Sequence, residues 1–288
     1  MFDGFKLEIR KVNNVSLRCR IGGSGPPLLL LHGNPQTHVM WHLIAPQLSQ
    51  RFTVVASDLT GYGESSKPPS SEDHFAFSKR SMGNDQLALM NDLGFDKFSV
   101  VGHDRGGRVA YRMALDHQKT ITKITVLDII PTLETFQRSD VKFGQGYYHW
   151  FFLAQPSPLP EKLITQNPEW FWRWHTKRVD RDFFSEVAVE DYLRCFKNPE
   201  TVRAICEDYR AGISADCEHD RKDQEQGNKI KAPLLVLWGK QAKLESWYDT
   251  VDIWKDWAQS VKGEAVDCGH YLAEEEPEKT LKLLMDFL

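Results

Sequence analysis

The sequence predicts an α/β fold: a mostly parallel twisted sheet with helices on both faces and a helical cap inserted after the sixth strand. Short apolar runs, which suit strands buried on both faces, alternate with segments that suit helices. This alternation stops after residue 131 and resumes at about residue 229, and the region between is rich in aromatic residues. We therefore expect a core domain of residues 1–131 and 229–288, with a cap of residues 132–228.

The elements follow one another in an order typical of a parallel sheet with helical crossovers. The N-terminus alternates charged and apolar residues on both sides of Asn13-Asn14, which predicts two paired strands, and Gly22–Pro27 then breaks the pattern. The strands are predicted at 5–11, 15–21, 28–31, 52–56, 98–101, 121–130, 233–238 and 265–266. The helices are predicted at 41–48, 75–93, after residue 104, at 247–258 and at the C-terminus.

Composition excludes several classes of protein. A net charge of −4 argues against a nucleic-acid partner. The five cysteines are scattered without a Cys-x-x-Cys pair, which argues against a disulfide framework and a zinc site, and we predict neither a metal nor a cofactor. No apolar run reaches the roughly 18 residues of a membrane helix. We expect a cytoplasmic protein without a membrane partner, and a homodimer is compatible with these features.

The segment Gly102-His-Asp-Arg-Gly106 follows the strand at 98–101 and opens a helix. It keeps the frame of a nucleophile elbow, Gly-x-Ser-x-Gly, in which a sharp turn exposes the central side chain at the start of a helix. Here the central residue is Asp104. A carboxylate can attack carbon and form an ester, which water must later hydrolyse. Asp104 is therefore the predicted nucleophile.

Two further residues lie just after predicted strands, where ligands bind in open α/β sheets. His270 follows the last strand and is the predicted base that activates water, and Asp128 follows Thr125–Leu127 and is predicted to orient the imidazole. Asp267 and Glu245 are competing acids, of which Asp267 lies very close to His270 in sequence. Hydrolysis of the ester also needs an oxyanion site, and we expect the backbone N–H groups of Asn34 and Arg105 to supply it.

The chain resembles the α/β-hydrolase superfamily over nearly its whole length and, within it, the haloacetate dehalogenases, which include fluoroacetate dehalogenase. The matching pieces are His32-Gly33, Asp58–Gly63, Gly102–Arg108, Leu127–Ile129, Tyr148–Trp150, Glu207–Gly212 and Gly269-His270. The resemblance implies an α/β-hydrolase fold and hydrolytic dehalogenation of a short 2-haloacid, such as haloacetate or fluoroacetate, to glycolate and halide through an aspartyl ester. The implied partners are the small-molecule haloacid and water.

The resemblance also implies roles for five further side chains. Arg105 and Arg108 would hold the substrate carboxylate, and His149, Trp150 and Tyr209 would donate to the leaving halide. Repulsion between an anionic nucleophile and an anionic haloacid is about 4 kcal/mol at 4 Å and an effective dielectric constant near 20, so cations must offset it. Guanidinium groups suit this task because they bind carboxylates through two hydrogen bonds.

Two alternatives remain open. Epoxide hydrolysis uses the same Asp, His and Asp but needs cap tyrosines to protonate the epoxide oxygen, for which Tyr147, Tyr148 and Tyr209 are candidates. A non-catalytic ligand-binding protein of the same fold would have lost a member of the triad, and none is missing. Asn34 departs from fluoroacetate dehalogenases, which commonly have phenylalanine there, and resembles the halide-holding asparagine of haloalkane dehalogenases.

Overall fold

The computed structural model describes residues 1–176 and 183–288. Eight strands form a single sheet in the order β1-β2-β4-β3-β5-β6-β7-β8. The strands β1 and β2 pair antiparallel with each other, β2 pairs antiparallel with β4, and all other neighbours are parallel. The predicted mostly parallel sheet is thus confirmed. Its strands are β1 Lys6–Val12, β2 Val15–Gly22, β3 Pro27–Leu31, β4 Thr53–Ser57, β5 Phe98–His103, β6 Ile121–Leu127, β7 Leu234–Gly239 and β8 Val261–Val266.

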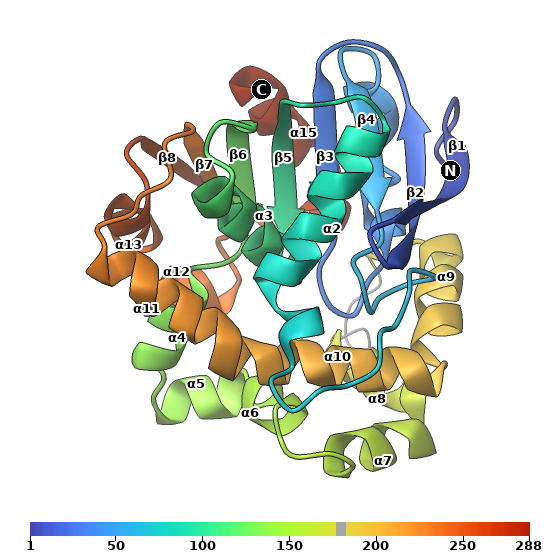
Figure 1. Ribbon diagram of the computed structural model, residues 1–288, viewed down its shortest axis with the longest axis vertical. Helices are drawn as coiled ribbons and strands as arrows, with labels where there is room; N and C mark the ends of the chain where they lie inside the picture. Colours follow the sequence, from blue (N-terminus) through green and yellow to red (C-terminus); the bar gives the residue numbers. More distant parts are fainter. Residues whose placement is uncertain (177–182) are drawn as a thin grey trace.

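Helices cover the sheet and close one of its ends. In Figure 1, α2 and α3 cross the near face of the strands, and α15 lies behind them. The core helices are η1 His38–Trp41, α1 Ala45–Leu48, η2 Phe75–Phe77, α2 Lys79–Asp92, α3 Arg105–Asp116, α12 Lys243–Trp247, α13 Thr250–Trp257, α14 Leu272–Glu275 and α15 Pro277–Phe287. The sheet interior is apolar, since Leu28–Leu31 of β3 and Val100-Val101 of β5 are fully buried.

Every element described between β6 and β7 is a helix, in the region where the sequence predicts the cap. These helices are α4 Thr132–Gln137, α5 Val141–Gly146, α6 His149–Leu153, α7 Leu159–Gln166, α8 Pro168–His175, α9 Glu186–Phe196, α10 Pro199–Ala211, the π-helical turn η3 Gly212–Asp216, and α11 Cys217–Glu225. Figure 1 shows α5 to α10 gathered at the end of the sheet where the strands terminate. Residues 177–182 of the predicted cap lie outside the described residues.

Three predicted helices are divided in the structure. The helix expected at 41–48 becomes η1 and α1, because Pro46 has no N–H to bond the preceding turn. The helix expected at 75–93 is interrupted at Ser78, which adopts an extended conformation and caps α2 by accepting from the Ser81 N–H. Similarly, Asp249 caps α13 and separates it from α12. A proline and two capping residues, Ser78 and Asp249, thus set these helix boundaries.

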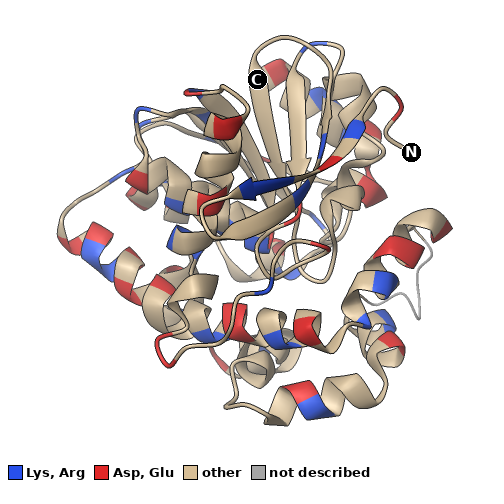
Figure 2. Ribbon diagram, turned by 45° about the vertical axis from the view of Figure 1, so that its right-hand side comes forward, with Lys and Arg blue, Asp and Glu red and all other residues tan. Residues whose placement is uncertain are grey.

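Charges on the outer helices of the cap are mixed in sign. Figure 2 shows acidic and basic residues interspersed along these helices. Several are neighbours one helical turn apart, such as Arg173 with Glu169 and Arg203 with Glu200, each pair 2.9 Å apart. Exposed pairs of this kind contribute little stability.

Candidate active site

Asp104 lies at the tip of a sharp turn between β5 and α3. Its backbone has φ 47° and ψ −114°, an unusual conformation for a residue with a side chain. The turn is tight because a Cβ atom at Gly102 would lie 2.4 Å from the Gly106 carbonyl oxygen, and one at Gly106 would lie 2.4 Å from the His32 oxygen. The glycines of the predicted elbow are therefore required sterically.

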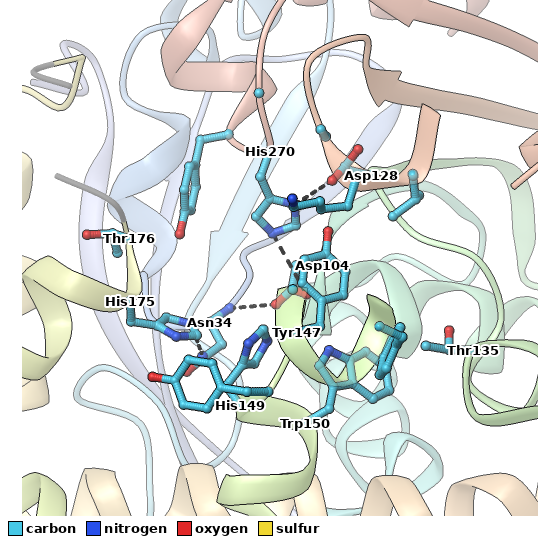
Figure 3. A pocket seen from close by; sticks show the side chains of 18 of the residues that line it. Asn34, Asp104, Asp128, Thr135, Tyr147, His149, Trp150, His175, Thr176 and His270 are labelled. Atoms are coloured by element: carbon cyan, nitrogen blue, oxygen red, sulfur yellow. Dashed lines mark hydrogen bonds and ion pairs between the residues drawn. The ribbon is translucent and has the colours of Figure 1, made fainter. Parts of the chain in front are cut away.

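His270 lies between two carboxylates (Figure 3). Its Nδ1 is 2.5 Å from Asp128 Oδ2, and its Nε2 is 3.9 Å from Asp104 Oδ2. The other oxygen of Asp128 accepts the Gly239 N–H at 3.0 Å, which fixes the carboxylate at the end of β6. The structure thus brings the three predicted catalytic residues together in the arrangement of nucleophile, base and orienting acid.

The competing acids lie elsewhere. Asp267 is exposed and accepts a hydrogen bond from Gln241, and Glu245 accepts from the Trp238 indole N–H. Asp128 is therefore the acid placed against His270.

The electrostatic environment keeps Asp104 ionised. Burial alone would raise the pKa of Asp104, but His270, His103 and the two arginines that follow the nucleophile together hold the pKa well below its ordinary value. For His270, burial lowers the pKa, but the hydrogen bond and charge of Asp128, together with the charge of Asp104, raise it above the ordinary value. The site therefore holds an ionised carboxylate beside an imidazole whose pKa is raised.

A backbone donor holds one oxygen of the nucleophile. The Asn34 N–H donates to Asp104 Oδ1 at 2.9 Å. Arg105 is the first residue of α3, so its N–H belongs to the helix terminus, which has no intrahelical acceptor and carries partial positive charge. Asn34 thus holds Oδ1, and Oδ2 is the oxygen that lies toward His270.

The triad opens into a cavity of about 730 Å³ between the sheet end and the helices that follow β6. The strand side contributes Asp104, Asp128 and His270, and the helical side contributes His149, Trp150 and Tyr209, among others. Aromatic and polar side chains thus face the nucleophile from the cap region.

Residues 26–277 match the family described as alpha/beta hydrolase fold. The chain belongs to the α/β-hydrolase superfamily. It is 40% identical to a fluoroacetate dehalogenase from Burkholderia sp, over 100% of this chain and 95% of that protein. It is also 32% identical to a soluble epoxide hydrolase from Corynebacterium sp. (strain C12), over 96% and 94% of the two chains. Its fold matches the crystal structure of a putative alpha/beta hydrolase from Nostoc sp PCC 7120 with a TM-score of 0.97 and 47% identity, over 100% and 99% of the chains.

These findings confirm the resemblance to the haloacetate dehalogenases and assign the chain to the hydrolases. Both a fluoroacetate dehalogenase and epoxide hydrolases are among its relatives, so the class of substrate depends on the residues around Asp104. Among the described residues of this α/β hydrolase, no three His, Cys, Asp or Glu side chains are grouped so that they could hold a metal ion. No described helix is both long and apolar enough to cross a membrane.

The two arginines of this hydrolase have different partners. Arg105 donates from Nε and Nη2 to the Asp208 carboxylate at 2.8 and 2.6 Å, and Asp208 also binds Lys79 and Tyr62. Arg105 is not among the residues that line the cavity, whereas Arg108 is. Arg105 is thus paired with a carboxylate on α10, while its Nη1 has no described partner and its guanidinium carbon lies 4.2 Å from the centre of the Tyr209 ring. A role of Arg105 at the substrate carboxylate stays a prediction.

Arg108 is buried without a carboxylate. Its Nη1 donates to the Ile130 carbonyl at 3.0 Å and to the Thr132 hydroxyl at 3.1 Å, and its Nε has no described partner. No described carboxylate lies within salt-bridge distance of its guanidinium. Burial and the charge of Arg105 both lower the pKa of Arg108. The site thus contains a desolvated cation that faces the cavity, which is costly unless a ligand supplies an anion.

The three predicted halide donors line the cavity side by side. The Tyr209 ring lies 5.9 Å from the His149 ring and 6.0 Å from the Trp150 ring, both in edge-to-face geometry. Burial holds the pKa of His149 well below its ordinary value, and any positive charge on His175 would lower it further, so the His149 imidazole is neutral. Burial and Asp104 raise the pKa of Tyr209, which therefore keeps its proton. The cluster offers an imidazole, an indole and a phenol as hydrogen-bond donors.

Two histidines near the nucleophile are absent from the predicted site. His103 lies beneath His270, and its Nε2 is 2.8 Å from the His270 carbonyl oxygen. His175, at the end of α8, lines the cavity with its ring 4.6 Å from that of His149. His103 stands inside the elbow motif, which is a signal that could have found it. His175 stands in an aromatic run without a motif, so only the packing of α8 reveals it.

Proposed function

We propose that this α/β hydrolase releases halide from short 2-haloacids through an ester on Asp104. The observation that carries the proposal is Arg108, a buried cation that lines the cavity and has no described carboxylate partner. A substrate carboxylate would supply the missing anion and form charge-assisted hydrogen bonds with the guanidinium. A neutral epoxide would leave Arg108 unpaired, so the same residue disfavours that class of substrate.

In the first step, Asp104 Oδ2 attacks C2 of the haloacid. A carbon–oxygen bond forms, the carbon–halogen bond breaks, and its electron pair leaves with the halide. His149, Trp150 and Tyr209 would stabilise the halide by donating hydrogen bonds from the cap side. Inversion follows at C2 where that carbon is chiral. Before the attack, His270 Nε2 lies 3.9 Å from Asp104 Oδ2, so a protonated imidazole would form an ion pair with the carboxylate.

In the second step, water attacks the ester carbonyl carbon of Asp104 while His270 takes its proton. The bond between Cγ and Oδ2 then breaks, the hydroxy acid leaves with one proton of the water, and the other proton passes from His270 to solvent, which restores the Asp104 carboxylate. The carbonyl oxygen is Oδ1, which Asn34 already holds with its backbone N–H, so a donor is in place for the developing oxyanion. Esterification also removes the charge of Asp104, which is one of the causes that raise the pKa of His270. The imidazole therefore becomes easier to deprotonate at the stage when it must act as a base.

The proposal is tested by incubating the enzyme with fluoroacetate and chloroacetate and measuring halide release, with Asp104→Asn as the matched variant. We expect halide and glycolate from the wild type and none from the variant. A single turnover in ¹⁸O-labelled water should place the label in the Asp104 carboxylate. Label found only in glycolate would mean direct attack by water, and absence of halide from every haloacid would exclude the dehalogenase.

Epoxide hydrolysis is the second candidate, because Tyr147 and Tyr209 both line the cavity and each could protonate an epoxide oxygen. Burial and the charge of Asp128 hold the pKa of Tyr147 well above its ordinary value, so this phenol also keeps its proton. Measuring diol formation from styrene oxide under the same conditions compares the two functions directly. Diol formation without halide release would favour the epoxide hydrolase.

A further inference from the structure

Three polar side chains meet on the cap side of Asp104, apart from the triad. The Asn34 Nδ2 lies 3.3 Å from His175 Nε2 and 3.4 Å from the Tyr209 hydroxyl oxygen. All three residues line the cavity. Figure 3 shows Asn34 between the nucleophile and His175, with His149 beside them. Because the Asn34 backbone also binds Asp104, this cluster is tied directly to the nucleophile.

The direction of these hydrogen bonds follows from the atoms involved. An amide nitrogen can only donate, so His175 Nε2 and the Tyr209 oxygen both accept from Asn34. A phenol has a single hydrogen, and the Tyr209 hydroxyl donates to no other described residue. Tyr209 therefore accepts from the protein and retains its hydrogen for a ligand in the cavity.

The opposite orientation of the amide would reverse this arrangement. The Asn34 Oδ1 is buried and accepts no hydrogen bond from a described residue. If the amide were turned, Oδ1 would face Tyr209, and the phenol would donate its hydrogen to Asn34 rather than to a ligand. A neutral His175 with its proton on Nδ1 accepts at Nε2 and so stabilises the first orientation. In that tautomer His175 holds the Asn34 amide, and the amide in turn leaves the Tyr209 hydrogen to a ligand.

We propose that His175 and Asn34 are positioning residues that keep the Tyr209 hydroxyl hydrogen directed at the leaving group, and so assist the release of fluoride more than that of heavier halides. This inference rests on the proposed haloacid dehalogenation. As Asp104 Oδ2 bonds to C2, the electron pair of the carbon–fluorine bond passes to fluoride, which accepts the hydrogen bond without proton transfer. Fluoride is a poor leaving group and a strong acceptor, whereas bromide leaves readily and accepts weakly. Losing one donor therefore slows defluorination more than debromination.

The experiment measures single-turnover halide release from fluoroacetate and bromoacetate and takes the ratio of the two rates. We expect His175→Leu to lower the fluoride-to-bromide ratio about 10-fold or more, the usual effect of one hydrogen bond to a charged group. His175→Gln retains an acceptor near the position of Nε2 and should restore most of the ratio. Arg173→Gln, on the same helix but paired with Glu169 away from the cavity, is the matched control and should leave the ratio unchanged.

Combining His175→Leu with Tyr209→Phe distinguishes a positioning role of His175 from a general disturbance of α8. In the Tyr209→Phe background the hydroxyl is gone, so His175→Leu should cause no further fall in the ratio. Asn34→Leu keeps the backbone N–H that binds Asp104 but offers Tyr209 no oxygen, so it should lower the ratio less than His175→Leu does. His175→Ala provides a second variant if His175→Leu does not fold. An unchanged ratio in His175→Leu and His175→Ala, or a further fall in the double variant, would overturn the inference. A wild type that releases neither halide would instead refute the proposed function.

Discussion

The two walls of the cavity are built in different ways. The wall at the strand ends is built around backbone contacts: the Asn34 N–H holds Asp104, the Gly239 N–H holds Asp128, and the elbow glycines permit no side chain. The wall on the cap side includes side chains from α6, α8 and α10 that pack ring against ring. In the proposed mechanism, the first wall supplies the nucleophile and base, and the second supplies the donors that face a leaving group.

The difference indicates how chemistry and selectivity are divided in this hydrolase. Most substitutions leave a backbone N–H in place, so the donors that hold Asp104 and Asp128 persist when side chains change. The proposed attack and hydrolysis steps therefore depend on the backbone at the strand ends. Side chains on the cap helices can be exchanged without disturbing the elbow, so they can set substrate preference. Asp208 connects the two walls, because it lies on α10 and binds Arg105 at the start of α3. The following predictions test this division, beginning with the largest effect.

Removal of the base should stop the reaction after the first step. In His270→Gln, steady-state turnover should fall about 10⁴-fold, as for other members of such triads. One equivalent of halide per enzyme should still be released, because Asp104 needs no base to attack. Mass spectrometry of the protein should detect the trapped ester. His117→Gln changes a histidine bonded to Asn84 outside the cavity and should turn over normally. Loss of the first equivalent of halide in His270→Gln would contradict this order of steps.

Substitution of Arg108 should weaken the binding of haloacids much more than the binding of neutral analogues. In Arg108→Gln, KM for a haloacid should rise about 10- to 100-fold, since a hydrogen bond to a charged group contributes about 1.5–3 kcal/mol. The neutral analogue bromoacetamide lacks the carboxylate and should show a much smaller change. Initial-rate measurements on both substrates check this. Equal changes in KM for acid and amide would show that Arg108 does not recognise the carboxylate.

The two chemical steps should respond differently to pH. Attack requires ionised Asp104, whose pKa is held well below its ordinary value, so the first-turnover rate should be flat across neutral pH. Hydrolysis requires neutral His270, whose pKa Asp128 still raises after Asp104 is esterified, so the steady-state rate should fall about 10-fold per unit below the pKa that His270 has in the ester. Rapid-quench and steady-state rates from pH 5 to 9 test this. A parallel decline of both rates at low pH would contradict the assignment of the two steps to different ionisable groups.

The smallest expected effect is on stability and involves Glu274, a buried carboxylate on α14. Burial raises the pKa of Glu274 to about 8, although Tyr192 and Gln36 donate to it. The folded protein therefore retains a proton that the unfolded chain releases above about pH 4.5, so raising the pH from 5 to 8 reduces stability. Glu274→Gln removes this dependence, and the buried Gln36 Oε1, which lacks a described partner, can accept from the new amide.

Thermal unfolding at several pH values measures this effect. The midpoint of the wild type should decline by several degrees more than that of Glu274→Gln between pH 5 and pH 8, with the two proteins similar at pH 5. Glu278→Gln, an exposed carboxylate on α15, serves as the control and should follow the wild type. Parallel curves for wild type and Glu274→Gln would mean that Glu274 is ionised in the folded protein.

The sequence by itself determined the elements whose causes are local. The buried apolar runs predicted the parallel strands. The Gly-x-Asp-x-Gly frame predicted the turn at Asp104, because a Cβ atom at Gly102 or Gly106 would lie 2.4 Å from a backbone oxygen. The positions of Asp128 and His270 after strands also followed from sequence, since strand ends meet at one edge of a parallel sheet.

Only the tertiary structure decided which distant side chains meet. It placed Asp128 rather than Asp267 or Glu245 against His270, although both competing acids lie nearer in sequence. It paired Arg105 with Asp208, 103 residues away, and left Arg108 facing the cavity. It also brought His175 to Asn34 across 141 residues. These contacts depend on how the helices after β6 pack against the sheet end, and no periodicity or short motif encodes that packing.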